Sequence, residues 1–293
     1  MTRRQIRNLK SALKTQGAFL VRLIFSEALT IFALWLFFST AQGAQAFPEP
    51  LTIGSYELGR GIVAPGAMAT IHGRAFTTEA AKPLLADLPT ELSSVRVWLG
   101  GREKGLAVPL RYVGYDEIAV VMPAIPKAAT WWYGWQRVEV DAPLGFYVGW
   151  VVVMPTSAEI FTNRCLDSPA CANGMPFGGA WVNLQQVFPT LNLPIPNQNT
   201  KLWFYGSGFR NAARVVAWLT DELGGEVLIE CHAEAHAKFA GWDVVSFGLP
   251  ATIPRNGVEM PLQGEITIQL LAQQPLPMRW WSVANPVKVQ VQP

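Results

Sequence analysis

The chain has 293 residues, of which 50% are hydrophobic and 15% are charged. This balance is far from the charge-rich composition of disordered chains, and the length allows two folded domains. The net charge of +2 combines 23 basic with 21 acidic residues, and six of the basic residues lie before residue 23, where there is no acidic residue. Because the remainder has no clustered basic face, nucleic acid is excluded as a partner.

The first element in the chain is an apolar segment at 18–41, which is long enough to cross a ~30 Å hydrocarbon layer as a helix. A basic head precedes it, so the positive-inside rule places everything after this segment across the membrane, in the periplasm or outside the cell. Small residues at Ala44 and Ala46 also match a signal-peptidase site, with cleavage before Phe47. Residues 1–46 are therefore a transmembrane anchor or a signal peptide. We expect a retained single-pass anchor, because the segment exceeds the core of about 7–15 residues that signal peptides use.

One acidic residue, Glu27, lies inside the apolar segment. An ionisable group in a membrane-spanning helix is costly and usually pairs or meets a partner subunit. Glu27 is therefore a candidate contact within the bilayer. Local pairing with Arg22 is the alternative.

Beyond residue 46 the pattern is typical of an all-β fold, with short apolar and aromatic runs separated by Gly and Pro. We expect a first domain at 47–163, a loop-rich connector at 164–199 that is rich in Gly and Pro, and a second domain at 200–293. The clearest strands of the first domain are 67–72, 95–99, 110–113, 118–122, 136–140 and 146–153. Those of the second domain are 201–205, 215–219, 227–231, 244–249, 264–271 and 287–291.

Several short segments carry a resemblance to a known family. The segment IVAPGAMATIHG at 62–73 resembles the opening strand of bacterial IPT/TIG-type immunoglobulin-like modules. In the second half, LWFYGSGFR at 202–210 and FAGWD at 239–243 are similar to the partner module of the same exported pair. The resemblance implies two tandem immunoglobulin-like β-sandwich domains and an exported location. It implies no shared chemistry, because the module recurs as a building block in different proteins.

Two aromatic clusters stand out among the twelve tryptophans, and both fall near turns. Four large rings from five consecutive residues cannot all enter one sandwich core, and exposed aromatic patches mark interfaces. We therefore predict that these clusters contact a partner or the membrane surface. The alternatives are a loop that folds back over its own domain and a carbohydrate platform. The residues concerned are Trp131, Trp132, Tyr133 and Trp135 in the first cluster, and Trp280 and Trp281 in the second.

Histidines and carboxylates come together once in the exported chain, after an apolar run. On an extended segment His232, Glu234 and His236 would share one face, as zinc ligands can. We expect a solvated polar loop here and no metal site, because no fourth ligand is visible. His72 stands alone in an apolar strand and is expected to be a core histidine.

The three cysteines have different expected roles. Cys165 and Cys171 lie close together in the exported connector, so we predict that they form a disulfide. This leaves Cys231 unpaired, and its position at the end of an apolar run predicts a buried thiol.

The chain lacks the common catalytic signatures, including a nucleophile elbow, a zinc-protease helix and a phosphate-binding loop. We therefore assign no catalytic residue and no cofactor. The predicted function is that of a non-catalytic accessory or scaffold subunit on the outer face of a membrane protein complex, such as an electron-transfer or photosynthetic assembly. The alternative is a secreted adhesion or carbohydrate-binding protein.

Overall fold

The structure is a computed structural model that describes residues 51–292, apart from residue 57 and residues 84–86, 126–131, 163–177, 183–184, 188–191, 194–195, 197–199 and 278–279. Strands make up the regular structure of this part, and none of the described residues forms an α-helix. The all-β prediction is therefore confirmed for the described residues. The chain divides into two units at residues 47 and 48, and the described residues belong to the second unit. The predicted anchor with Glu27 lies outside the described residues.

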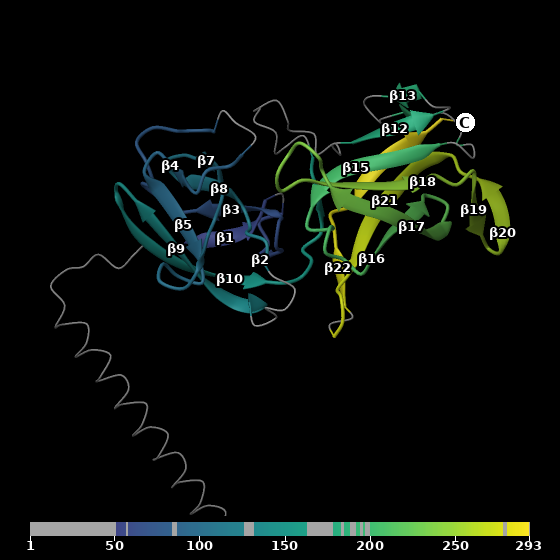
Figure 1. Ribbon diagram of the computed structural model, residues 1–293. Coiled ribbons are helices and arrows are strands. Elements are labelled where there is room, and N and C mark those ends of the chain that lie inside the picture. Colours follow the sequence, from purple (N-terminus) through teal and green to yellow (C-terminus); the bar gives the residue numbers. More distant parts are fainter. Residues whose placement is uncertain are drawn as a thin grey trace, which may run out of the picture. The chain divides into compact units, whose positions relative to one another are not determined.

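The first half of the described chain folds into two sheets (Figure 1). One sheet has the antiparallel order β1-β3-β8-β7, and the other has the order β2-β10-β9-β5-β4, with β6 paired to β5. The strands of the first sheet are β1 (Thr52–Ser55), β3 (Met68–His72), β7 (Leu110–Val113) and β8 (Glu117–Val121). Those of the second are β2 (Ile62–Val63), β4 (Glu91–Leu92), β5 (Val95–Leu99), β6 (Leu106–Ala107), β9 (Gly134–Ala142) and β10 (Gly145–Val153).

The core of this first sandwich lies between its two sheets. In β5, Val95, Val97 and Leu99 are buried, whereas the alternate residues Arg96 and Trp98 are more exposed. The inward residues pack against side chains such as Ile71, Phe76, Val138 and Val151 from the other strands. One face of each sheet therefore packs in the core. The opposite face of the β10-β9-β5 sheet takes no part in this packing.

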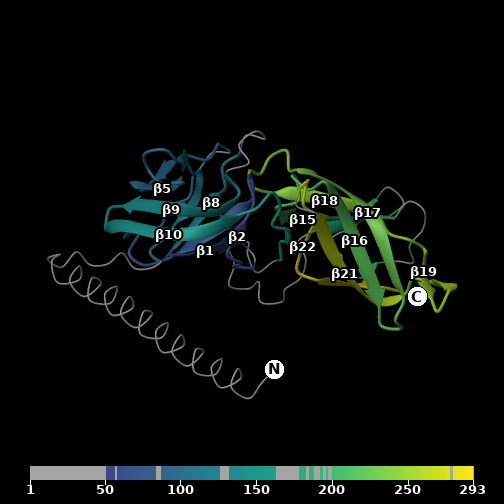
Figure 2. The same ribbon diagram turned by 90° about the horizontal axis from the view of Figure 1, so that it is seen from below.

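The second half folds into one sheet that doubles over a shared core. Its strand order is β13-β12-β15-β18-β17-β16-β21-β23-β14, and Figure 2 shows β16, β17 and β21 side by side. The bounds are β12 (Gly178–Val182), β13 (Gln185–Val187), β14 (Asn192–Leu193), β15 (Lys201–Ser207), β16 (Arg214–Asp221), β17 (Glu226–Ala235), β18 (Asp243–Gly248), β21 (Gly264–Gln273) and β23 (Val287–Val291). Two peripheral pairings complete this half, in which β22 (Trp281–Val283) pairs with β21, and β19 (Thr252–Arg255) pairs with β20 (Val258–Pro261).

Strand β17 joins the two layers of the second sandwich. Its first part, up to Cys231, pairs with β16, and its second part, from His232, pairs with β18. Leu202, Phe204 and Phe247 from one layer share a buried cluster with residues such as Ile268 from the other. Strand β17 therefore connects the two layers, which enclose a single core.

The segment predicted as a connector contributes strands to this second sandwich. Strands β12 and β14 lie within 164–199 and pair with β15 and β23 respectively. The short strand β11 (Glu159–Ile160), which falls inside the predicted first domain, also pairs with β15. The second sandwich therefore begins before residue 163 along the chain.

Candidate interaction surface

The outer face of the β2-β10-β9-β5 sheet carries large side chains that its own fold leaves uncovered. In β10 the inward residues are buried, while Phe146 and Trp150 point outward, with 58% of Trp150 exposed. In β9, Trp135 points outward and is 69% exposed. We call this surface the aromatic sheet face, and its members are Ile62, Trp98, Trp135, Phe146, Val148 and Trp150.

The strand register places these side chains next to one another. Trp135 pairs with Val152, and Trp150 pairs with Arg137, two residues further along β9. Trp135 and Trp150 therefore occupy diagonal positions on the same face, where side chains stand about 7–8 Å apart and large rings can meet a common partner. Phe146 continues the same row along β10.

Charged groups cross the middle of the face and are already paired. The buried carboxylate of Glu139 accepts a hydrogen bond from the backbone N–H of Arg102 (2.8 Å) and lies 2.9 Å from the guanidinium of Arg137. The guanidinium of Arg102 lies 3.3 Å from Asp141 and stands over the ring of Trp98, 5.3 Å from its centre. These contacts pair the charged groups in the middle of the face with one another.

A hollow of about 530 Å³ opens at one end of the aromatic sheet face. It lies between the loop that follows β5 and the outward residues of β9 and β10. Gly100 in that loop has a φ of +86°, and a Cβ there would lie 2.6 Å from the ring of Trp132. Glycine is thus required for the loop to pass over this ring. The hollow is lined by Gly100, Gly101, Arg102, Glu103, Lys104, Arg137, Glu139 and Phe146.

The structure divides the predicted aromatic loop between core and surface. Trp132 is only 5% exposed and belongs to the core of the first sandwich, and Tyr133 packs against that core. The interface prediction is therefore wrong for Trp132, because its ring fills the space under Gly100. Trp135 does point outward, and Trp131 lies outside the described residues.

Sequence reasoning missed Phe146 and Trp150 as surface residues. Their strand was predicted, and its period of two places both on the same face. The signal was therefore present in the sequence, although neither residue was singled out.

The second aromatic cluster is exposed at the β21–β22 hairpin. Trp280 is 64% exposed and Trp281 is 38% exposed. This exposure is compatible with the predicted contact role of both residues, which stays a prediction.

The candidate metal ligands do not converge. His232 and Glu234 lie on the exposed face of β17, with 3.4 Å between the ring Nε2 and the carboxylate. His236 instead accepts hydrogen bonds at Nδ1 from the backbone N–H groups of Lys238 and Phe239. Within the described part of the chain, no group of three His, Cys, Asp or Glu residues could hold a metal ion. The expected polar loop is in fact partly strand, since β17 extends to Ala235.

The environment of His236 explains its role. Its ring stacks on Phe239 at 4.8 Å, and burial together with the charge of Lys238 lowers its pKa. The neutral ring can accept the two backbone hydrogen bonds, whereas a proton at Nδ1 would remove them. His236 is therefore a structural residue of the turn that follows β17.

Two further sequence predictions can be compared with the structure. His72 is exposed at the end of β3, so the prediction of a core histidine is wrong. Cys231 is free and partly buried, and burial raises the pKa of its thiol to about 12, as expected of an unreactive cysteine. Cys165 and Cys171 lie outside the described residues.

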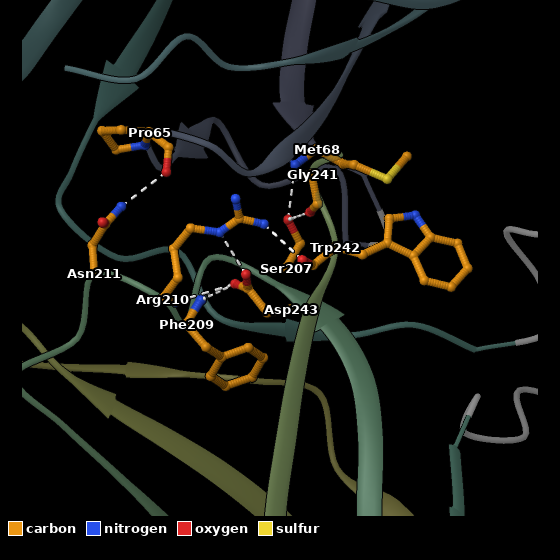
Figure 3. A network of polar contacts seen from close by, with 9 residues as sticks. All are labelled: Pro65, Met68, Ser207, Phe209, Arg210, Asn211, Gly241, Trp242 and Asp243. Carbon is orange, nitrogen blue, oxygen red and sulfur yellow. Dashed lines mark hydrogen bonds and ion pairs between the residues drawn. The ribbon is translucent and has the colours of Figure 1, made fainter. Parts of the chain in front are cut away.

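A polar network connects the two sandwiches, and Figure 3 shows its members pointing toward one another. The hydroxyl of Ser207 accepts a hydrogen bond from the backbone N–H of Met68 (2.8 Å) and donates one to the carbonyl of Gly241 (3.1 Å). The side-chain amide of Asn211 donates to the carbonyl of Pro65 (2.9 Å). The first sandwich is thus bonded to the loops of the second.

Asp243 and Arg210 hold these loops in place. The Arg210 guanidinium points at the Asp243 carboxylate, with 2.6 Å between Nε and Oδ1 (Figure 3). The same carboxylate accepts a hydrogen bond from the backbone N–H of Phe209 (2.7 Å). Burial raises the pKa of Asp243 despite the attraction of Arg210, so this ion pair is costly to bury.

An apolar cluster reinforces the same junction. Met68 and Val121 of the first sandwich pack with Phe161 and Trp242, and the last two rings lie 5.2 Å apart. A Cβ at Gly241 would lie 2.6 Å from the Met68 side chain, so the loop and the strand are in close contact. These contacts bury apolar surface between the sandwiches, and such burial favours one fixed arrangement.

Comparisons with known proteins place the chain in no named family. No family model matches it, and no curated protein matches it. Among solved structures, bovine butyrophilin is 8% identical with a TM-score of 0.22, and the match covers 84% of this chain and 100% of that one. A tandem of titin immunoglobulin domains is 8% identical with a TM-score of 0.20, and the match covers 79% of this chain and 92% of that one.

In the described part of the chain, no helix is long and apolar enough to cross a membrane.

Proposed function

We propose that the chain is a non-catalytic accessory subunit that binds a protein partner through the aromatic sheet face. The observation that carries this proposal is the row of outward rings on a rigid sheet, with Trp135 and Trp150 largely exposed beside an ordered charged centre. Aromatic rings and arginine are enriched at binding hot spots, and contiguous exposed apolar patches mark interaction sites. The IPT/TIG-type classification belongs to this proposal, and its support is the sequence resemblance together with the all-β fold.

The proposed location is the outer face of a membrane complex. Its support is the apolar segment at 18–41 and the basic head before it, which together fit a retained single-pass anchor. Intact-mass analysis of the protein from native membranes tests this location. A mature N-terminus at Phe47 would contradict the anchor and favour a secreted protein.

The binding proposal is tested with a double variant of the full chain, Trp135→Ser with Trp150→Ser. Both side chains point away from the core, so the fold should survive, while co-purification of the partner should weaken by about 2 kcal/mol or more, the scale of a hot spot. Trp218→Ser is the matched control, because Trp218 is an outward tryptophan on a strand of the second sandwich. Unchanged co-purification by the folded double variant would contradict the proposal.

A carbohydrate ligand is the second candidate function, favoured by one specific observation. Aromatic sugar platforms usually need neighbouring carboxylates, and the register places the partly exposed Asp141 on the same face as Trp150. Binding of the purified protein to a glycan array, abolished by Trp150→Ser, would favour this candidate over a protein partner.

A further inference from the structure

The turn that follows β17 is a part of the second sandwich that reaches the first. We call residues 236–242 the junction turn. The carbonyl of Gly241 accepts a hydrogen bond from the hydroxyl of Ser207, which itself accepts one from the backbone N–H of Met68 (Figure 3). The ring of Trp242 packs in an apolar cluster with the side chain of Met68. The contact between the sandwiches therefore depends on where the junction turn lies.

His236 fixes the shape of the junction turn from its first position. Its backbone N–H donates a hydrogen bond to the carbonyl of Trp242 (2.9 Å), which closes the turn. Its ring Nδ1 accepts hydrogen bonds from the backbone N–H groups of Lys238 (3.0 Å) and Phe239 (3.1 Å). The carbonyl of Phe239 in turn accepts from the N–H of Trp242 (3.2 Å). The imidazole thus holds the backbone that positions Trp242.

The imidazole can do this only while it is neutral. Because Nδ1 accepts two hydrogen bonds, the proton of the neutral ring is at Nε2. A second proton, at Nδ1, would face two N–H donors and remove both bonds. The ring cannot easily turn away, because aromatic rings lie on several sides of it. Their centres lie 4.8 Å from that of His236 for Phe239, 5.5 Å for Tyr205 and 6.1 Å for Trp242.

The cations near the imidazole oppose a second positive charge. Burial and the charge of Lys238, which belongs to the same turn, lower the pKa of His236. From the first sandwich, the guanidinium of Arg111 on β7 stands over the ring of Trp242, 5.6 Å from its centre. This ring therefore already attracts one cation. Because the folded pKa is lowered, the stabilisation is complete above pH 6.5 and is lost as the pH falls through the folded pKa.

The carboxylates closest to His236 along the chain have other partners. Glu234 lies on the exposed face of β17, 3.4 Å from the ring of His232, and Asp243 is paired with Arg210. Burial raises the pKa of Asp243, which gives the opposite dependence on pH, because its contribution to stability is lost as the pH rises through the folded pKa. A loss of junction contacts in acid is therefore assigned to His236.

We propose that the junction between the two sandwiches is sensitive to pH, because a proton at Nδ1 of His236 releases the junction turn from the first sandwich. The released contacts are those of Gly241 and Trp242. This inference depends neither on the proposed partner nor on the proposed location. Its consequence concerns the aromatic sheet face, which is carried by the first sandwich. The orientation of that face relative to the second sandwich is fixed at neutral pH and becomes freer in acid.

Hydrogen exchange of the full chain in detergent micelles measures the release directly. The readout is the N–H of Met68, which is bonded to Ser207 across the junction (2.8 Å). Mass spectrometry with electron-transfer fragmentation gives its rate, which is divided by the rate of an unstructured chain at the same pH. From about pH 7.5 to about pH 5, we expect this protection to fall about tenfold, the effect of losing one or two hydrogen bonds. The N–H of Val108, bonded to Val97 inside the first sandwich (2.9 Å), should keep its protection.

Two variants assign the change to one side chain. His236→Asn has no ring to titrate, so its protection at Met68 should be equal at the two pH values, and the wild type should approach it at about pH 5. His232→Asn is the matched control, because it removes an exposed histidine of β17 that makes no contact with the junction turn in the described residues. This control should behave like the wild type.

Three results would overturn the inference. Constant protection at Met68 in the wild type would show that the junction does not respond to pH, whatever the variants do. A fall that persists in His236→Asn would assign the response to another group. Equal falls at Met68 and Val108 would show that the whole fold loosens and that the junction is not the site of the change.

Discussion

Replacing Trp132 with alanine tests the division of the aromatic loop into core and surface. The ring is buried beneath Gly100 and packs in the core of the first sandwich. Burial of about 200 Å² of aromatic surface at about 25 cal/mol per Å² corresponds to about 5 kcal/mol. Truncations of this kind lower the free energy of unfolding by about 3–5 kcal/mol. If residues 48–293 unfold together, this loss lowers the melting temperature by about 6–20 °C.

The matched control is Trp135→Ala, three residues further along the chain. Its side chain is 69% exposed, so its removal should change the unfolding free energy by no more than about 0.5 kcal/mol. Urea titration followed by circular dichroism measures both values on the same day and in the same buffer. Equal destabilisation by the two variants would refute the assignment of Trp132 to the core.

Three other predictions follow from the junction, the turn after β17 and the connector. Asp243→Ala leaves the partly buried guanidinium of Arg210 without its carboxylate. The free energy of unfolding, measured by urea titration, should fall by about 3–5 kcal/mol. A fall below about 1 kcal/mol would show that the pair does not hold the junction. The pKa of His236 is lowered in the fold, so its contribution to stability is complete above pH 6.5 and is lost as the pH falls through the folded pKa. Melting temperatures of the wild type and His236→Asn should therefore differ more above pH 6.5 than below the folded pKa, and a constant difference would contradict the role of Nδ1. Cys165 and Cys171 should appear as one linked peptide in non-reducing mapping, and alkylation of both in unreduced protein would exclude the bridge.

The strands were predictable because their signal is local. The predicted runs 95–99 and 287–291 coincide with β5 and β23, since alternating apolar residues mark one buried face. The run 110–113 also coincides with β7, although this strand contains an irregularity and does not alternate. The ends of β17 were missed, because this strand continues through His232 and Glu234 onto the second layer. Burial still alternates along this strand as far as Glu234, but the polar residues after Cys231 end the apolar run on which the prediction relied.

The surface and the junction depend on contacts between distant residues. Ser207 and Met68 are 139 residues apart in sequence, so nothing local indicates their hydrogen bond. Trp132 and Trp135 belong to one aromatic run, but the first ring packs under the distant Gly100 and the second points outward from β9. Sequence reasoning could therefore identify an aromatic candidate site, but it could not assign each ring to a side of the sheet.

Site-specific photo-crosslinking in native membranes tests the central claim most directly. The full chain would carry p-benzoylphenylalanine in place of Trp135, Trp150 or Trp218, the first two on the aromatic sheet face and the third on the second sandwich. We predict that illumination links the same partner protein to positions 135 and 150, and that position 218 gives no such product. Crosslinks from position 218 alone, or none from positions 135 and 150 in an intact complex, would contradict the claim that the aromatic sheet face binds the partner.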